Sequence, residues 1–520
     1  MEAELLLPGV EVVKSESEET SGSGAEARAP LAVRFEVVNR AQMLFRTVDV
    51  EQLIGPEHQA RAIWEFVGQL DLGKFSEAVK VYEGQRGRAA YDPHLMVSLW
   101  VYSYSRGVSA GREITRLCEH DPAYQWLTGM KVVNYHSLTD FRVKHEAALR
   151  ELFIQVLAVL SKAGLVTLKR VMNDGTKIKT RASKQSFRRG QKIKDHLAAA
   201  RQQVAALERQ SEEESGQQIT RARERAARER EQRLAAAMAE FDKLKQERPA
   251  EADQLRVSES EPEARKLKQP DGGFAPSYNV QLSTDQAQGI IVGVGLSQSA
   301  SDSTELVAAL ARVKENTGQL PVVVVTDGGY TTGENISALE KQGIELIAPV
   351  TDSHEQLKQR GIDPKFSREA FNFDATGNCF TCPAGQTLSY KGRERRGKRT
   401  RVRYQARAAA CANCAWKALC CPRTERGRSL SRLDYETEIL RQKAKMQTTA
   451  AQEIYKQRAQ TAEFPIAWLK EKIGLRRFTV RGMLKAELET LWACLTYNLQ
   501  QWMRLCWRPQ FSSVAATIEQ

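Results

Sequence analysis

Residues 321–326, Pro-Val-Val-Val-Val-Thr, form an apolar run that ends at Asp327-Gly-Gly-Tyr330. A short apolar run without polar alternation is typical of a β-strand that is buried on both faces. A sheet with both faces buried needs helices on each side, so this run favours an α/β fold with a mixed sheet flanked by helices.

Further strands are predicted on both sides of this run. Residues 166–172 are rich in Val and Leu, alternate in polarity, and end at Asn173-Asp174-Gly175. The other predicted elements, in chain order, are a β-hairpin at 278–283 and 289–295, a helix with Asp302 or Ser303 near its cap, the strand 321–326, a helix at 332–342, a strand at 344–349, and closing helices at 450–472 and 482–505.

Residues from about 45 to 160 show helical patterning. Asp92-Pro93 opens one helix, with Asp92 as the expected N-cap, and a second helix starts near Gly111. A third helix begins at Ser137, which we expect to cap it. Three short helices with small connectors fit a helix-turn-helix-like module.

The region 190–250 has a different composition from its surroundings. Its apolar residues recur at helical spacing, and almost everything between them is Ala, Arg, Glu, Gln or Lys. This pattern predicts an antiparallel helical hairpin with its turn at Gly216. Two roles stay open for the hairpin: self-association of the chain, or an insert on a monomer.

The charge balance points to a polyanionic partner. The net charge is +13, which suits phosphate neutralisation, although many proteins that bind no nucleic acid are equally basic. No stretch of about 18 apolar residues is present, so no membrane span is expected. The start of the chain lacks a basic region and a long apolar core, so no signal peptide is expected either.

Six of the nine cysteines lie between Cys379 and Cys421. Clustered cysteines in a cytosolic protein indicate metal binding before disulfides, and Cys379-x-x-Cys382 with Cys411-x-x-Cys414 has zinc-ribbon-like spacing. Cys420 and Cys421 follow directly, so the six thiols exceed the four ligands that zinc takes. Free thiols in an irregular insert are the alternative.

Asp174 and Asp327 each end a predicted strand, and each is followed by Gly. Glycine lets the backbone turn sharply and leaves a carboxylate exposed at the sheet edge, where sites of open α/β sheets gather. Adjacent strands lie about 4.8 Å apart, so two such carboxylates could share a divalent ion. Asp-Gly is also a common turn dipeptide, so a third ligand is needed.

Glu463 is the candidate third ligand. It lies seven residues before Lys470, so the two side chains share one helix face, two turns apart. The alternative is a solvated, charged helix face. Pro465 follows closely and either kinks the helix or marks a helix start.

Three segments together resemble the catalytic blocks of bacterial insertion-sequence transposases of the DDE class. They are Val171-Met-Asn-Asp174-Gly-Thr-Lys-Ile-Lys179, Val325-Thr-Asp327-Gly-Gly-Tyr330, and Tyr455-x-x-Arg458-x4-Glu463-x6-Lys470. Arg476-Arg477-Phe478, Arg481-Gly482 and Tyr497-Asn498-Leu499 resemble the C-terminal segment of that family, and the region around Tyr91-Asp92-Pro93 resembles its N-terminal helical domain. The resemblance covers roughly residues 45–505. The chain departs from the family in having Phe464-Pro465 after the glutamate.

This resemblance implies a ribonuclease H-like catalytic fold in which Asp174, Asp327 and Glu463 are the catalytic, metal-binding residues. The expected cofactor is Mg²⁺, two ions, with Mn²⁺ as a substitute. Tyr455, Arg458, Lys470, Lys177 and Lys179 are the expected DNA or phosphate contacts. Cys382-Pro-Ala-Gly resembles a knuckle of related transposases, so the preferred set for a structural Zn²⁺ is Cys382, Cys411, Cys414 and Cys420 or Cys421.

The implied function is a transposase that cuts and joins double-stranded DNA at the terminal inverted repeats of a mobile element and at its target. A homo-oligomer on DNA and a cytoplasmic, nucleoid-associated location are expected. A transposase-derived DNA-binding protein without catalysis and a related metal-dependent nuclease are the alternatives; no guide-binding module is seen for an RNA-guided partner. The expected parts are a disordered tail (1–30), a helical DNA-binding domain (31–160), a catalytic domain (161–185, 270–352 and 446–508), a helical-hairpin insert (186–269), a cysteine-rich insert (353–445) and a tail (509–520).

Overall fold

The computed structural model describes residue 43 and residues 47–77, 89–213, 218–350, 354–396, 399–433, 435–508 and 510. The chain divides into two compact units, Met1–Val48 and Asp49–Gln520, and nearly all described residues belong to the second. The predicted tails at 1–30 and 509–520 lie outside the described residues, apart from residue 510. None of the described helices combines the length and the apolar character that a membrane span requires.

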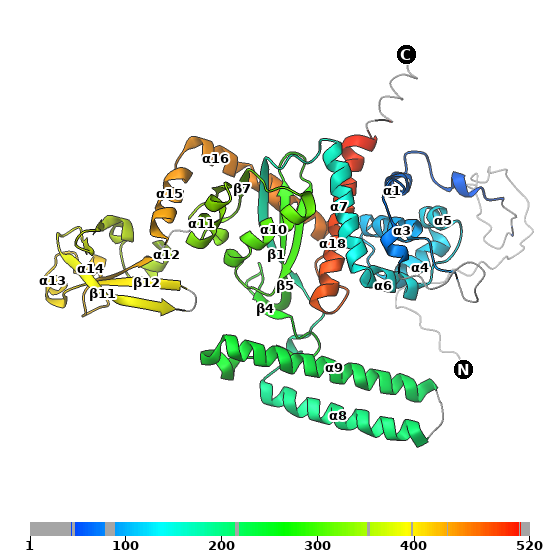
Figure 1. Cartoon of the computed structure of the whole chain (residues 1–520), viewed down its shortest axis with the longest axis horizontal. Coiled ribbons are helices and arrows are strands. Elements are labelled where there is room, and N and C mark those ends of the chain that lie inside the picture. Colours follow the sequence, from blue (N-terminus) through cyan, green and yellow to red (C-terminus); the bar gives the residue numbers. More distant parts are fainter. Residues whose placement is uncertain are drawn as a thin grey trace, which may run out of the picture. The chain divides into compact units, whose positions relative to one another are not determined.

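A mixed six-stranded sheet organises the centre of the second unit, with helices against it (Figure 1). Its strand order is β4-β5-β1-β7-β8, and β6 also pairs with β5. β1 is antiparallel to β5 and parallel to β7, and β7 is parallel to β8, so the class is α/β as predicted. The strands are β1 (Arg170–Lys179), β4 (Arg265–Lys268), β5 (Phe274–Asp285), β6 (Ile291–Ser297), β7 (Val323–Val325) and β8 (Glu345–Ile347).

β1 differs from its prediction at both ends. Residues 166–169 are not part of a strand, and Leu168 has a positive φ of 54°. Asp174-Gly175 is not a turn, because the strand continues through it to Lys179. The cause is long-range: nine residues of β1 pair in continuous register with β5, including Asp174 with Leu282.

Helices cover both faces of the parallel part of the sheet. Val324 of β7 and Leu346 of β8 pack with residues of α10 (Leu306–Thr317) and α11 (Gly333–Lys341). Val325 and Ile347 point to the opposite face of the sheet. They pack with residues of α16 (Thr449–Lys456) and of the segment that follows it. Both sides of β7 are thus covered as expected, although β7 has only three residues and Val322 is exposed.

The N-terminal helices and the C-terminal α18 share one hydrophobic core with β5 and β6. Figure 1 shows α7 and α18 side by side, and Asn498 of α18 pairs with both the backbone N–H and the carbonyl of Ile291 in β6. The helices are α1 (Gln59–Val67), α2 (Gly73–Ser76), α3 (Pro93–Ser105), α4 (Gly111–His120), α5 (Pro122–Thr128), α6 (Tyr135–Lys144), α7 (Glu146–Lys162) and α18 (Met483–Trp502).

The predicted start signals of these helices are largely correct. Asp92 caps α3 by accepting a hydrogen bond from the N–H of His94, with Pro93 in the first turn, and α4 starts at Gly111. The predicted cap Ser137 is wrong: α6 begins two residues earlier and Asn134 caps it. The side chain of Asn134 accepts a hydrogen bond from the N–H of His136, which satisfies a free donor of the first turn.

Two antiparallel helices, α8 (Gly190–Glu213) and α9 (Gln218–Glu247), occupy the region of the predicted hairpin (Figure 1). Their apolar side chains pack against each other: Ile193 lies with Phe241 and Leu244, and Leu197 lies with Leu234. The predicted turn residue Gly216 lies outside the described residues. The short strands β2 (Phe187–Arg188) and β3 (Val257–Ser258) pair at the base of the two helices.

The cysteine-rich region contains a second sheet of five antiparallel strands in the order β13-β12-β11-β10-β9. Its core includes Phe371, Phe380, Leu388 and Tyr404. Strands β11 and β12 carry many basic residues, at 391–396 and 399–403, and Glu394 pairs with Arg401 and Arg403 among them. The elements are α12 (His354–Gln359), β9 (Asn372–Asp374), β10 (Cys379–Thr381), β11 (Thr387–Arg396), β12 (Arg399–Ala406), α13 (Ala408–Ala412), α14 (Lys417–Cys420), β13 (Ser429–Leu433) and α15 (Glu436–Met446).

Candidate active site

β1 carries Asp174 toward the residues that follow α16. Side chains alternate along a strand, so Met172, Asp174 and Thr176 share one side of β1. Met172 packs against Ala451 and Ala462, which belong to the C-terminal helical region. The Asp174 carboxylate therefore faces the same region, at the point where the apolar contacts end.

Asp327 follows β7, the parallel neighbour of β1. Met172 is opposite Val325 in the register, so Asp174 and Asp327 each lie two residues beyond this pair. The side chain of Asp327 accepts a hydrogen bond of 2.8 Å from the N–H of Gly329, which fixes the turn that follows. Two carboxylates from adjacent strands thus lie near each other, but only Asp327 follows the end of its strand, whereas Asp174 lies within β1 and does not end it as predicted.

Arg458 connects Asp174 with Glu463. Its Nη2 atom lies 3.0 Å from Oδ2 of Asp174, and its Nη1 atom lies 3.4 Å from Oε1 of Glu463. The Arg458 and Asp174 side chains are 13% and 14% exposed, whereas Glu463 is 61% exposed. The arginine is therefore a largely buried cation between two carboxylates, one of which is open to solvent.

A π-helical segment, Ala459–Glu463, separates α16 from α17 (Phe464–Glu471). The predicted continuous helix over 450–472 is therefore interrupted. Pro465 has no N–H to donate back along the helix, and its ring would clash with the preceding turn, so a wider turn ends there and a new helix begins. Glu463 is the last residue of the wider turn.

The pKa of the Asp174 carboxyl is raised to about 6, chiefly by burial, and the charges of Asp327 and Asp302 act in the same direction. The Arg458 guanidinium and the N–H of Gly175 act in the opposite direction. Because burial is the main cause of the shift, a further cation beside Asp174 would favour its ionised form.

Lys470 reaches the same part of β1. Its Nζ atom donates a 2.5 Å hydrogen bond to Oγ1 of Thr176. Burial lowers the pKa of Lys470, Arg476 lowers it further, and Asp174 raises it. Tyr455, in contrast, is half-buried against the apolar cluster of Met172 and Val325. Of these two predicted phosphate contacts, Lys470 lies next to Asp174, whereas Tyr455 packs against the edge of the apolar cluster.

The two lysines after Asp174 have different surroundings. Nζ of Lys177 lies 3.7 Å from Oδ2 of Asp302. The backbone of Lys179 pairs with the segment after α17: its N–H donates to the carbonyl of Arg476, and its carbonyl accepts from the N–H of Phe478. This segment is one of those on which the family resemblance rests, and it extends the edge of the sheet.

The sequence analysis missed a polar network behind Asp174. Oδ1 of Asp302 accepts hydrogen bonds from Asn279 (2.6 Å) and Gln281 (2.7 Å), and Gln281 accepts one from the Tyr330 hydroxyl (2.5 Å). Asp302 was expected only as a helix cap. The sequence feature that could have revealed this network is the series of polar residues at every second position of β5, Asn279, Gln281 and Ser283, which are all buried.

Gly175 makes room for this network. A Cβ atom at this position would lie 2.4 Å from Nε2 of Gln281, 2.7 Å from Oδ1 of Asp302 and 3.1 Å from the Tyr330 hydroxyl. The glycine after Asp174 is therefore required by close approach within a strand, and the turn that the sequence suggested is absent.

The carboxylates suit Mg²⁺ chemically but are not gathered around one point. Among the residues that the structure describes, no three His, Cys, Asp or Glu side chains are close enough to hold a single metal ion. Arg458 lies between Asp174 and Glu463 and occupies the space that a metal ion would need there. The donors are all carboxylate oxygens, the ligands that Mg²⁺ prefers, so the residues fit that ion once Arg458 moves aside.

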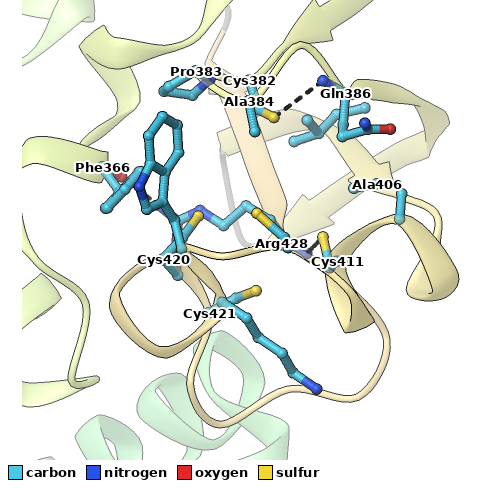
Figure 2. Close-up of a pocket in the computed structure, with 15 residues that line it drawn as sticks. Phe366, Cys382, Pro383, Ala384, Gln386, Ala406, Cys411, Cys420, Cys421 and Arg428 are labelled. Atoms are coloured by element: carbon cyan, nitrogen blue, oxygen red, sulfur yellow. Dashed lines mark hydrogen bonds between the residues drawn. The ribbon is translucent and has the colours of Figure 1, made fainter.

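Five of the six clustered cysteines line one cavity in the cysteine-rich region (Figure 2). They are Cys382, Cys411, Cys414, Cys420 and Cys421. Cys379 lies on β10, where its Sγ atom is near Gly377, and it does not line the cavity.

Two protein families match the sequence. The family described as a transposase DDE domain matches residues 381–503, and the family described as a transposase domain (DUF772) matches residues 48–144. The first match includes Arg458, Glu463 and Lys470 but neither Asp174 nor Asp327. No curated protein matches the sequence.

Proposed function

The matches to two transposase domains identify the chain as an insertion-sequence transposase of the DDE class, and from this premise we propose that it cleaves DNA at element ends and joins the ends to a target. Both reactions are attacks of a hydroxyl on a phosphodiester, so one site can perform them. The proposed catalytic residues are Asp174, Asp327 and Glu463.

One observation carries this proposal: Arg458 joins Asp174 to Glu463, which is 289 residues later in the chain. Asp327 lies beside Asp174 on the neighbouring strand and contributes to its raised pKa. Three carboxylates from distant segments, in the chain order that the family resemblance implies, thus belong to one edge of the sheet.

The strand order supports a ribonuclease H-like catalytic fold. If β4 is set aside as part of the intervening region, the order is β6-β5-β1-β7-β8, with three antiparallel strands followed by two parallel ones. Asp174 lies on the first strand of this set, Asp327 follows the fourth, and Glu463 lies in the C-terminal helical region. This is the arrangement that the resemblance implies.

Asp174, Asp327 and Glu463 would hold the divalent ions, two Mg²⁺ with Mn²⁺ as a substitute. When bound, such ions activate the attacking hydroxyl and stabilise the leaving oxygen of the phosphodiester. The burial and the raised pKa of Asp174 favour a cation beside it.

Arg458 and Lys470 would act on the DNA backbone. Arg458 is held by two carboxylates, and a phosphate can accept hydrogen bonds from the same two N–H groups. Lys470 is held at Thr176, two residues from Asp174, where its charge would attract the phosphate that is cut. Lys177 is paired with Asp302, and it would contribute to the site mainly through this ion pair.

The test is cleavage and strand transfer in vitro, with linear DNA that carries the element's ends, in Mg²⁺ or in EDTA. Wild-type protein is expected to nick and join the ends only with metal. Asp174→Asn, Asp327→Asn and Glu463→Gln should each abolish both reactions while end binding persists. Glu453→Gln, an exposed glutamate on α16, is the matched control and should retain activity.

The outcomes separate the alternatives. Metal-dependent cutting without joining would assign the chain to the nucleases. End binding without cutting in Mg²⁺ or Mn²⁺ would assign it to transposase-derived DNA-binding proteins. Cutting that survives Glu463→Gln would remove this residue from the site.

A further inference from the structure

Phe464, the residue after the proposed catalytic Glu463, exposes its ring to solvent. The residue is 47% exposed. Of the phenylalanines that the structure describes, only Phe464 and Phe274 are exposed, and the others are buried or half-buried. A phenylalanine ring is normally found in a core, because its apolar surface is costly to leave in water. A single exposed ring needs no explanation by itself, so its surroundings decide what it can bind.

Trp468 holds this ring from one side. The two ring centroids are 5.5 Å apart, with an angle of 42° between the ring planes, and both residues lie on α17, one turn apart. Trp468 is itself fixed, because its Nε1–H donates a 2.8 Å hydrogen bond to Oε1 of Gln500 in α18 and its ring packs against the hydrophobic core. A ring that is already held loses little conformational freedom when a second flat group packs on its exposed side.

The segment around Phe464 is strongly basic. Residues 456–481 contain seven lysines and arginines but only two acidic residues, one of which is Glu463. Lys472 and Arg477 are exposed, and Lys470 lies at Thr176 on β1. Such an excess of positive charge attracts a polyanion. The exposed ring therefore lies in a surface that is complementary in charge to a chain of phosphates.

An aromatic ring in a basic surface is suited to an unpaired nucleic-acid strand. The bases stack on the ring while the cations hold the backbone. Phe464 and Glu463 are neighbours in the chain, with Cα atoms about 3.8 Å apart. Only a sugar separates the base of a nucleotide from its phosphate, so a phosphate bound at Glu463 brings a base within reach of the ring. Inside a duplex both faces of a base are covered, so the base must be at an end or have left the helix.

We propose that Phe464 stacks on an unpaired base next to the phosphodiester that is cut, and this inference rests on the proposed function. The ring would hold the strand in position while Glu463 acts on the phosphate. Every base has a flat face, so the contact would position the DNA without reading its sequence. A second copy of the chain is the competing partner for the ring. The basic surroundings disfavour it, because two copies of this surface would bring like charges together.

Photocrosslinking tests the contact directly. Linear DNA that carries the element's ends is prepared with iodouracil at each nucleotide next to the end in turn, and its complex with the full chain is irradiated in EDTA. A crosslink to Phe464, mapped by mass spectrometry, is expected at one of these nucleotides. It should be absent in Phe464→Leu, which keeps an apolar side chain against Trp468, and a crosslink should return in Phe464→Trp. Crosslinks to other residues alone would overturn the proposal.

Affinity for the same DNA gives a second readout. An abasic nucleotide at the crosslinked position should weaken binding by the wild type on the order of tenfold. Phe464→Leu should bind unmodified DNA about as weakly, and the abasic nucleotide should weaken it no further, because both changes remove one contact. Phe274→Leu is the matched control, an exposed phenylalanine at the start of β5, and it should respond to the abasic nucleotide as the wild type does.

The outcomes separate this contact from its alternatives. Equal weakening by the abasic nucleotide in the wild type and in Phe464→Leu would overturn the proposal. A changed oligomeric state of Phe464→Leu without DNA, with no such coupling to the base, would assign the ring to self-association instead. Failure of the proposed function differs: a protein that crosslinks through Phe464 but does not cut in Mg²⁺ keeps the contact and loses the catalytic role. A protein that cuts but never crosslinks through Phe464 keeps the function and loses the contact.

Discussion

Nη2 of Arg458 lies 3.0 Å from Oδ2 of Asp174, and this ion pair is largely buried. The pair joins β1 to the wider helical turn that carries Glu463. Because the arginine occupies the space between two proposed metal ligands, divalent ions bound there would compete with Arg458 for the same carboxylates. Metal binding would release the guanidinium for the DNA phosphate.

Arg458→Ala is therefore predicted to bind Mn²⁺ more tightly, by on the order of tenfold, which corresponds to about 1.4 kcal/mol. DNA cleavage should fall in the same variant, because the phosphate loses a bidentate partner. Isothermal titration with Mn²⁺ and a cleavage assay measure the two effects. Arg441→Ala, an exposed arginine of α15, is the control for net charge. Unchanged or weaker Mn²⁺ binding in Arg458→Ala would contradict the competition.

Gly175→Ala is predicted to destabilise the protein by about 1–3 kcal/mol, the usual cost of overpacking a filled site. The added methyl would meet Gln281 and Asp302 at distances that side chains do not tolerate. Urea denaturation measures the loss. Gly55→Ala is the control, because no atom lies within 4 Å of a Cβ there. Equal stability of the two variants would show that the polar network behind Asp174 can shift to accommodate the methyl group without loss of stability.

Local patterns predicted the parts of this fold that local physics determines. The apolar run before Asp327 predicted a strand with both faces covered, and Asp92-Pro93 predicted the start of α3. Both depend on nearest neighbours in the chain. The proximity of Asp174 and Asp327 was also predicted, from their places beside glycines in predicted strands, although Asp174 lies within its strand and not at the end.

Contacts between segments far apart in the chain determined the features that the sequence patterns did not predict. Asp174-Gly175 has the composition of a turn, yet it continues a strand because β5 pairs along its whole length. The network of Asp302 with Asn279 and Gln281 joins segments about 20 residues apart, and no single segment reveals it. The position of Arg458 between two carboxylates follows only from the packing of the C-terminal helices on the sheet.

The stability of the variant Glu261→Gln is predicted to improve relative to wild type as the pH rises above 4.5. Glu261 is buried, and its burial raises the pKa of its carboxyl above the ordinary 4.5. A raised folded-state pKa contributes stability at low pH, and this contribution is lost as the pH rises through the folded value. Urea denaturation from pH 4.5 to 8 measures the trend. Glu251→Gln, an exposed residue, should show no such trend; a flat difference for Glu261→Gln would contradict the argument.

Glu489→Gln is predicted to cost about 3 kcal/mol of folding free energy, since removing one partner of a buried ion pair leaves the other charge unpaired. Glu489 is 1% exposed and Arg142 is 5% exposed, and their nearest atoms are 3.9 Å apart. The same carboxylate accepts hydrogen bonds from the N–H and the hydroxyl of Thr479, so it joins α6, α18 and the loop between α17 and α18.

Glu487, two residues earlier on α18, is the matched control. It pairs with Arg150 at 3.0 Å, but the arginine is 40% exposed, and water screens the pair. Glu487→Gln should therefore cost less than about 1 kcal/mol. Chemical denaturation of both variants at one pH gives the comparison. If the two cost the same, the Arg142–Glu489 pair does not hold the N-terminal helices to α18, and their shared apolar core alone must do so.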